Sequence, residues 1–210
     1  MKRVADRVSD LLVEFGIKHV FMVTGGGAMH LNDALGRNRS LKVINMHHEQ
    51  ACSMAADGYA RINNQMACVN VTTGPGGINA INGVFGAWTD SVPMIVVSGQ
   101  VKRETLNFDN SKLRQLGDQE NNIVSMVKNI TKFSYILKNP NYVDDVISKA
   151  LKIASTGRPG PVWIDIPIDI QGALYEKSKQ IKMDRLLVPK IKKVNKSTIN
   201  KVERLIQNSK

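Results

Sequence analysis

The sequence contains few cysteines, few aromatic side chains and no long apolar run. Its two cysteines, Cys52 and Cys68, have no metal-ligand spacing. Both lie among apolar or small residues, so we expect buried free thiols in a reducing cytoplasm. No apolar stretch approaches the roughly 20 residues of a membrane span. The N-terminal stretch MKRVADRVSDLLVEFG carries charge throughout and lacks the apolar centre of a signal peptide. These absences favour a cytoplasmic protein that makes no contact with a membrane.

The net charge of +11 at first suggests a nucleic-acid partner. However, residues 177–210 hold eleven Lys or Arg and two acids, which leaves a net charge of only +2 for residues 1–176. The excess therefore belongs to the last part of the chain and not to a face of the main domain. Aromatic residues are not interleaved with the basic ones, as stacking on bases would require. We expect no nucleic-acid partner.

Helical and strand patterns alternate along the chain, which predicts an α/β fold with a parallel central sheet and helices on both faces. In such sheets ligands bind at the loops that follow the carboxyl ends of the strands. The sequence predicts strands at 19–23, 42–46, 65–72, 93–98, 132–137 and 161–165, and helices at 3–15, 29–35, 48–61, 78–88, 141–155 and, more briefly, from Gln119.

The chain divides into three parts by composition. Residues 1–171 hold the alternating pattern and form the main predicted domain. Residues 172–195 are Lys-rich and include Pro189, so we expect a linker there. Residues 196–210 are amphipathic, with Ser197 as the predicted N-cap, and would begin a truncated central domain. The polar stretch 100–118 is a long loop, which in a compact domain is usually functional or mobile.

Glu49 is the most informative single residue. It follows the strand at 42–46 and opens an Ala-rich helix, where a carboxylate is costly to bury without a partner. Glu49 is therefore a candidate working carboxylate, and the alternative is a helix-start Glu favoured by the helix dipole. Taken alone, Gly25–Gly27 could be a tight turn, Pro75 a helix-start proline, and Asn79 and Gln119 ordinary polar residues.

Five segments together carry a specific resemblance, in order and spacing, over most of residues 1–171. They are VFMVTGGGAMHLNDAL, HHEQACSMAADGYAR, VNVTTGPGGINAINGVFGAWTDSVPMIVVSGQV, QENNIVSMVKNITK and STGRPGPVWIDIPIDIQ. The sequence resembles the N-terminal pyrimidine-binding domain of thiamine-diphosphate-dependent enzymes of the acetolactate synthase group. The resemblance implies the pyrimidine domain of the thiamine diphosphate-binding fold.

The resemblance implies a role for each matching residue. Glu49 matches the Glu that hydrogen-bonds N1′ of the aminopyrimidine ring and favours the imino tautomer of the 4′-amino group. Gln119 matches a Gln near the reacting centre. The other cofactor-binding matches are Thr24, Gly25 and Gly26 in the loop that approaches the thiamine ring, and Pro75 and Asn79 on the pyrimidine side. No residue is assigned to a metal, because His47 and His48 have no ligand partners in the pattern.

The resemblance also implies an activity for the full-length protein. It would decarboxylate a 2-keto acid, pyruvate in the first instance, and transfer the acyl unit to a carbonyl acceptor, as a transferase. A homodimer or homotetramer would form through the helices at 51–60 and 78–87. The diphosphate and its Mg²⁺ would be held by a C-terminal domain, and any FAD mainly by a central domain. The fragment itself would therefore be inactive.

Two positions depart from the family pattern. Thr24 stands where the family usually has Pro, and Asp118 stands where acetolactate synthases carry Phe. An acid at position 118 suggests a more polar acceptor. One alternative is therefore acetyl transfer to a nucleotide-linked keto sugar in surface polysaccharide synthesis. A further alternative is a non-catalytic assembly module with the same fold.

Overall fold

A computed structural model describes residues 2–108, 112–176 and 194–209 of the chain. Its described part contains a six-stranded parallel sheet in the order β3-β2-β4-β5-β7-β6. Val69 on β4 aligns with Val96 on β5, which in turn aligns with Trp163 on β7. The predicted α/β fold with a parallel sheet is confirmed. The strands are β2 His19–Met22, β3 Lys42–Asn45, β4 Ala67–Val71, β5 Met94–Gln100, β6 Phe133–Ile136 and β7 Pro161–Pro167.

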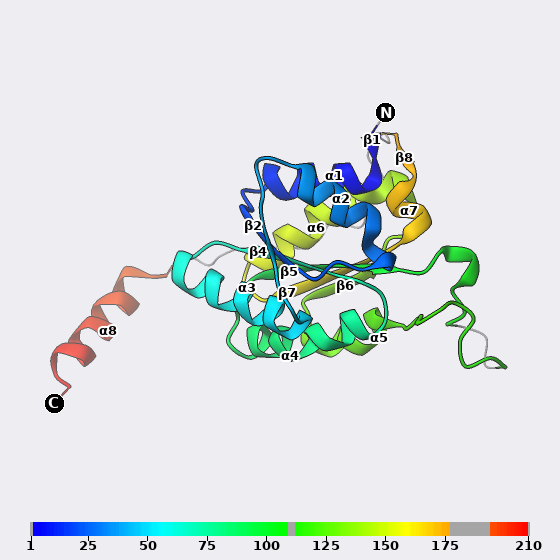
Figure 1. Cartoon of the computed structure of the whole chain (residues 1–210). Helices are drawn as coiled ribbons and strands as arrows, with labels where there is room; N and C mark the ends of the chain where they lie inside the picture. The colour runs from blue at the N-terminus through cyan, green and yellow to red at the C-terminus, as the bar shows by residue number, and fades with distance from the viewer. Residues whose placement is uncertain (1, 109–111, 177–193, 210) are drawn as a thin grey trace.

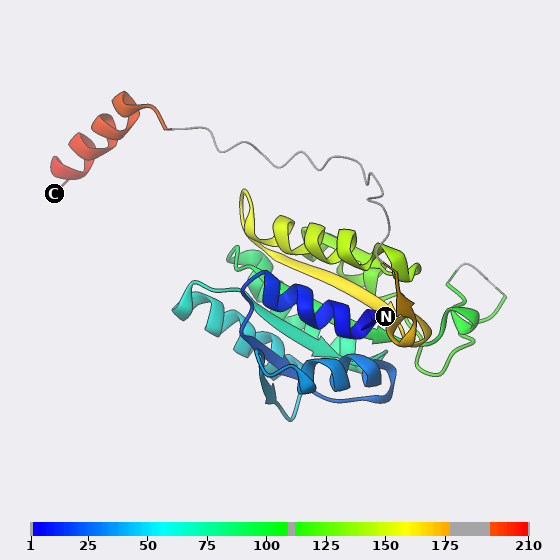
Figure 2. The ribbon, with the colours of Figure 1, turned by 90° about the horizontal axis from the view of Figure 1, so that it is seen from above.

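Helices cover both faces of the sheet, as Figure 1 shows. The first layer comprises α1 (Val4–Glu14), α2 (Met29–Arg37), α6 (Val143–Ser155) and α7 (Ile168–Gly172). Figure 2 looks down on this layer, with α1, α2 and α6 lying across the sheet. The second layer comprises α3 (Glu49–Asn63), α4 (Pro75–Thr89) and α5 (Ile123–Val127). Each layer packs its own apolar core against the sheet.

The central strands are buried along their whole length. Every residue of β4, β5 and β7 is buried, which is why these segments are mostly apolar and do not alternate between apolar and polar residues. The largest fully buried side chain is that of Trp163 on β7. Both cysteines are buried free thiols, as expected, and burial raises the pKa of the Cys52 thiol to about 12.

Helices α3 and α4 approach each other closely because their contact is made of small residues. A Cβ atom at Gly83 would overlap Ser53 Oγ and would lie 2.7 Å from the backbone nitrogen of Met54. Glycine at this position lets the two backbones meet without an intervening side chain. The predicted small-residue helices therefore pack against each other within this one chain.

Two helix starts differ from the predicted ones because a side chain caps the helix at another residue. The helix predicted from Gln119 begins at Ile123, because the Asn122 side chain accepts a hydrogen bond from Ser125 N (3.0 Å) and caps it there. Asn195, not Ser197, caps the last helix, α8 (Lys196–Gln207), since its side chain accepts from Ser197 N (3.1 Å).

Regular structure also extends past residue 171. Strand β8 (Leu174–Tyr175) pairs antiparallel with β1 (Lys2–Arg3), and Val4 N donates to Ala173 O (2.9 Å). Strands of two residues have no periodicity that a sequence pattern could show. Most of the predicted linker, residues 177–193, lies outside the described residues. In the part of the chain that the structure describes, no helix is both long and apolar enough to cross a membrane.

Candidate functional site

Glu49 is the first residue of α3, at the carboxyl end of β3. The preceding residue, His48, caps the helix, because its Nδ1 atom accepts a hydrogen bond from Gln50 N (3.1 Å). Only 9% of the Glu49 surface is exposed. Its Oε2 atom accepts a hydrogen bond from Asn79 Nδ2 (3.0 Å) on α4. Among the described residues the buried carboxylate therefore has one side-chain partner, and that partner is another residue that the resemblance selected.

The first turn of α4 also borders the Glu49 carboxylate. A Cβ atom at Gly76 would lie 3.3 Å from Glu49 Oε1, so this glycine leaves room for the carboxylate. The carboxylate thus belongs to the first turn of α3 and lies beside the first turn of α4. The partial positive charge of a helix N-terminus stabilises a carboxylate. This arrangement explains how the fold tolerates a buried acid here. Two helix N-termini border the carboxylate, whereas an ordinary helix-start Glu is stabilised by its own helix alone.

The three glycines after β2 have two different environments. A Cβ atom at Gly25 would lie 2.5 Å from Thr72 Cβ, and one at Gly27 would overlap Thr73 Oγ1. Gly27 N also donates a hydrogen bond to Thr72 Oγ1 (3.1 Å). Gly26, by contrast, is exposed, and a Cβ there would meet nothing within 4 Å. Gly25 and Gly27 are therefore required for packing, and Gly26 is not.

Gln119 lies against the turn between β4 and α4. Gly74 has φ of +61°, and a Cβ atom there would lie 2.5 Å from Gln119 O and 2.9 Å from Gln119 Cβ. Gln119 itself has φ of +57°, a left-handed conformation that is uncommon outside glycine. Backbone in that region costs free energy and persists only where the surroundings hold it. The structure therefore brings Gln119 to the same connection as the other candidates.

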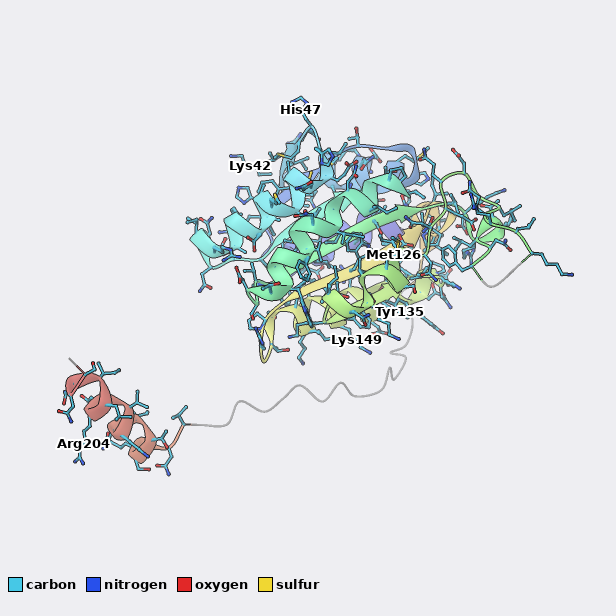
Figure 3. The ribbon with its side chains drawn as sticks, turned by 90° about the horizontal axis from the view of Figure 1, so that it is seen from below. Lys42, His47, Met126, Tyr135, Lys149 and Arg204 are labelled. Carbon is cyan, nitrogen blue, oxygen red and sulfur yellow. The ribbon has the colours of Figure 1, made fainter. Side chains whose placement is uncertain are left out.

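Most of the predicted site residues thus surround the β4–α4 connection. Thr72 is its centre, since both Gly25 and Gly76 face its side chain. Thr24 and Pro75 are exposed in the two turns concerned. His47 is exposed and its side chain extends outward from the β3–α3 connection, as Figure 3 shows. The structure therefore groups these residues in space, and their roles toward a cofactor stay predictions.

The sequence prediction of the site did not include Thr72, and it gave Gly27 and Gly76 no role of their own. The polar pair Thr72-Thr73 directly after the apolar strand was an available signal, because the residues that end a parallel strand line its ligand edge. The tight contacts of Gly27 and Gly76 carried no signal, since a glycine within a loop or helix start does not reveal which neighbour excludes its side chain.

A second buried polar cluster lies between β5 and β7. Asp165 is fully buried, and its carboxyl accepts hydrogen bonds from Ser98 Oγ (2.6 Å) and Gln100 Nε2 (3.0 Å). Trp163 Nε1 donates to Ser98 Oγ (2.8 Å). Burial raises the pKa of the Asp165 carboxyl to about 7, against the lowering effect of the two hydrogen bonds. The acid within the otherwise apolar run PVWIDIP is the sequence signal of this cluster.

A cavity of about 570 Å³ lies at the opposite, amino edge of the sheet. It is lined by residues at the ends of α1 and α3 and at the start of β5, among them Phe15, Asn64 and Pro93. None of the site residues lines it, so it does not belong to the site. Among the described residues, no three His, Cys, Asp or Glu side chains are grouped as a metal site would require.

Comparison with known proteins agrees with this geometry. Residues 2–126 match the family described as thiamine pyrophosphate enzyme, N-terminal TPP binding domain. The chain is 40% identical over 165 residues to the acetolactate synthase large subunit of Haemophilus influenzae, which covers 79% of this chain and 28% of that protein. It is 34% identical over 212 residues to the chloroplastic acetolactate synthase of Arabidopsis thaliana, covering 98% of this chain and 30% of that protein.

A third relative is the acetolactate synthase isozyme 3 large subunit of Escherichia coli, 37% identical over 166 residues, which is 79% of this chain and 28% of that protein. The chain thus spans less than a third of the length of these relatives. The family profile covers β2, β3, β4 and the Glu49–Asn79 pair. The chain belongs to the family of thiamine pyrophosphate enzymes, as their N-terminal TPP-binding domain.

Proposed function

We propose that this chain supplies the pyrimidine side of the cofactor site in a thiamine-diphosphate-dependent carboligase of the acetolactate synthase kind. The complete protein would decarboxylate a 2-keto acid, pyruvate in the first instance, and transfer the acyl unit to a carbonyl acceptor. The observation that carries the proposal is the buried Glu49 carboxylate, which is hydrogen-bonded to Asn79 and bordered by Gly76 at the ligand edge of the sheet.

The residues present fit the pyrimidine half of thiamine diphosphate. Glu49 offers a buried carboxyl group that can donate a proton to N1′ of the aminopyrimidine ring and accept it back, and Asn79 fixes the orientation of that group. Exposed Gly26 lets an incoming ring approach the backbone without meeting a side chain. When bound, the cofactor supplies the electron sink for decarboxylation. Glu49 would exchange a hydrogen-bonded proton with the ring nitrogen, and the Gly25–Gly27 loop would exclude water from one side.

Several features of the complete enzyme follow from the same proposal. We assign the Mg²⁺ ion and the diphosphate to a further domain outside this chain, and any FAD to a central domain. We place the domain boundary at residue 171, the linker at 172–195 and the start of the central domain at 196–210. Because catalysis would need the other domains, the fragment alone would be inactive. Two buried, unpaired thiols support a cytoplasmic location.

Assembly of the enzyme is proposed to use the outer surface of α3 and α4, as a homodimer or homotetramer. Large apolar side chains are exposed there, and Figure 3 looks onto this layer, with Met126 labelled on α5. Such a concentration of exposed apolar side chains is typical of an interface. The side chains concerned are Met54, Ile78, Phe85 and Trp88, with Met126 beside them.

The main test is Glu49→Gln in the complete protein. Gln keeps the shape and can still accept from Asn79, so the fold should persist. We expect the turnover of pyruvate with thiamine diphosphate and Mg²⁺ to fall by about 10²–10⁴-fold, as for loss of a general acid–base group. Gly26→Ala is the paired variant: its Cβ has free space in the chain, so a weaker affinity for the cofactor with an unchanged fold would locate the cofactor at this loop.

Retained turnover in Glu49→Gln would contradict the assignment of Glu49. Failure of the unmodified complete protein to bind thiamine diphosphate at all would favour the non-catalytic assembly module.

Asp118 supports a second candidate, a polar acceptor such as a nucleotide-linked keto sugar. Its side chain is exposed and directly precedes Gln119. We expect Asp118→Phe to shift the preference of the complete enzyme toward small 2-keto acid acceptors, measured as the ratio of acetolactate to branched-sugar product. An unchanged ratio would remove the argument for a sugar acceptor, and Asp57→Asn on α3 is the control for a general effect of losing a carboxylate.

A further inference from the structure

The buried cluster around Asp165 is connected to the site by an unbroken series of hydrogen bonds. Gln100 Nε2 donates both to Asp165 Oδ2 (3.0 Å) and to Asn121 O (2.8 Å). Asn121 Nδ2 in turn donates to Gly74 O (3.2 Å) in the β4–α4 turn. The series therefore runs from a carboxyl on β7, through β5, to the segment 117–121 and on to the helix that carries Asn79.

The orientation of the Gln100 amide is fixed at both of its ends. Its Oε1 atom accepts a hydrogen bond from Val101 N (3.0 Å), and the Asp165 carboxyl accepts from Nε2. A backbone N–H only donates and a carbonyl oxygen only accepts, so Val101 N and Asn121 O select the orientation in which Oε1 faces Val101 and Nε2 faces Asn121. Because Gln100 is fully buried, a lost partner would leave a desolvated polar group, which is costly.

The segment 117–121 needs such an anchor. Gln119 has a positive φ, and its carbonyl and Cβ lie against Gly74. Glu120 accepts a hydrogen bond from Gly117 N (2.7 Å), which closes the segment on itself but does not attach it to the sheet. The bond from Asn121 Nδ2 to Gly74 O attaches the segment to the β4–α4 turn, and, among the described residues, the bond from Gln100 to Asn121 O attaches it to the sheet. Without it, the strained backbone at Gln119 would be free to relax.

We propose that Asp165 and Gln100 are positioning residues, which hold the segment 117–121 so that Gln119 lies against Gly74 at the start of α4. Neither residue is placed to touch a substrate. They act through Asn121. Its backbone carbonyl is held by Gln100, which positions the neighbouring Gln119, and its side chain holds the turn that begins α4. The inference rests on the proposed function only where it concerns turnover, since the anchoring of the segment is a property of the chain itself.

The test compares Gln100→Met with Ser98→Ala in the complete protein. Met fills a similar volume but donates to neither Asp165 nor Asn121. Ser98→Ala also removes a hydrogen bond from Asp165, and it leaves the bond from Gln100 to Asn121 in place. The two variants therefore damage the same buried cluster, and only one of them releases the segment.

Three quantities are measured: amide hydrogen exchange of residues 118–121, turnover, and affinity for thiamine diphosphate. We expect Gln100→Met to speed the exchange of these amides at least 10-fold and to lower turnover about 10- to 100-fold, because small misplacements near a reacting centre cost that much. Cofactor affinity should change less than about 3-fold, since Glu49 and Gly26 are untouched. Ser98→Ala should leave both the local exchange and turnover within about 3-fold.

Equal exchange at 118–121 in the two variants would overturn the proposal, and so would equal losses of turnover. If Gln100→Met does not fold, Asn121→Ala tests the next bond of the series, because it removes the bond to Gly74 O and leaves the bond from Gln100 to Asn121 O in place. Exchange at 118–121 should then also speed up, and unchanged exchange would overturn the proposal. Absence of cofactor binding in the unmodified protein would instead refute the proposed function, and the exchange comparison would still decide whether Gln100 anchors the segment.

Discussion

The outer surfaces of the two helical layers of this domain differ in composition. The first layer carries charged pairs on its outer surface, with Arg3 bridging Asp6 and Asp33, and Arg7 bridging Glu14 and Asp144. In the second layer Arg61 pairs with Asp57 and Asp90 near the ends of α3 and α4, and apolar side chains are exposed along the rest of these helices. Exposed ion pairs add little stability, but they suit a surface that meets water. The two layers thus present different surfaces, and the proposed assembly would cover the second.

The Glu49–Asn79 pair of the site lies in the second layer. Glu49 begins α3 and Asn79 lies in the second turn of α4, so both belong to the layer with the apolar outer surface. A carboxylate near that layer becomes further shielded from water when the layer is covered. Assembly and the chemistry of the site are therefore expected to depend on each other.

The largest expected effect is loss of assembly when the apolar surface of the second layer is given a charge. Phe85→Glu on α4 should convert the oligomer of the complete protein to a smaller species, because burying an unpaired carboxylate at an interface is costly. Light scattering after size-exclusion chromatography measures the mass. Phe15→Glu, at the end of α1 in the first layer, is the matched control, since Phe15 is 42% exposed and should not affect assembly. Dissociation by both variants would abolish the contrast between the layers.

The next effect concerns the pH dependence of stability, which should have opposite signs for Asp165 in the central sheet and for Asp6 in the first layer. The pKa of Asp165 is raised to about 7 by burial, and its hydrogen-bonding partners on β5, Ser98 and Gln100, do not titrate. Between pH 4 and 7 the folded state therefore holds a proton that the unfolded state has lost. Stability should fall across this window as pH rises, by on the order of 4 kcal/mol at most.

Asp165→Asn should remove this slope, so that the variant gains stability relative to the unmodified protein at pH 8 and not at pH 4. In the first layer, the hydrogen bond from Arg3 holds the pKa of Asp6 below its usual range. Its contribution is present above about pH 4 and is lost as pH falls. Asp6→Asn should therefore act in the opposite direction, and hydrogen exchange of the β4 amides at several pH values measures both. A parallel response of the two variants would contradict the assignment.

A smaller effect is expected at the contact between α3 and α4. Gly83→Ala places a methyl group against Ser53 and should destabilise the domain by about 1–3 kcal/mol through overpacking. Gly36→Ala on α2 is the first-layer counterpart, with nothing within 4 Å of the added carbon. It should stabilise by about 0.5–1 kcal/mol, because alanine loses less backbone entropy in a helix. Hydrogen exchange of the β5 amides in the complete protein measures the stability change of both variants. Unchanged stability in Gly83→Ala would show that α3 and α4 can separate to make room for the methyl group.

Much of the fold could be predicted because its signals are local. The mostly apolar segments of β4 and β5 and the periodic helices α1 and α6 appear in the sequence as such. The helix expected from Gln119 did not begin there, since a single cap at Asn122 and a strained backbone outweigh the weak helical pattern. The two-residue pairing of β1 with β8 could not be foreseen, because it joins the two ends of the domain.

By itself, the sequence determined the fold class, the family and the residue types of the site, since strand and helix periodicity and linear motifs are properties of neighbours along the chain. Only the tertiary structure decided which residues hold the site together. Thr72 brings two loops to one place, Asn79 meets Glu49 across 30 positions, and Asp165 reaches the Gln119 segment through Gln100. These contacts join residues far apart in the chain, and they exist because parallel strands place their carboxyl ends along one edge.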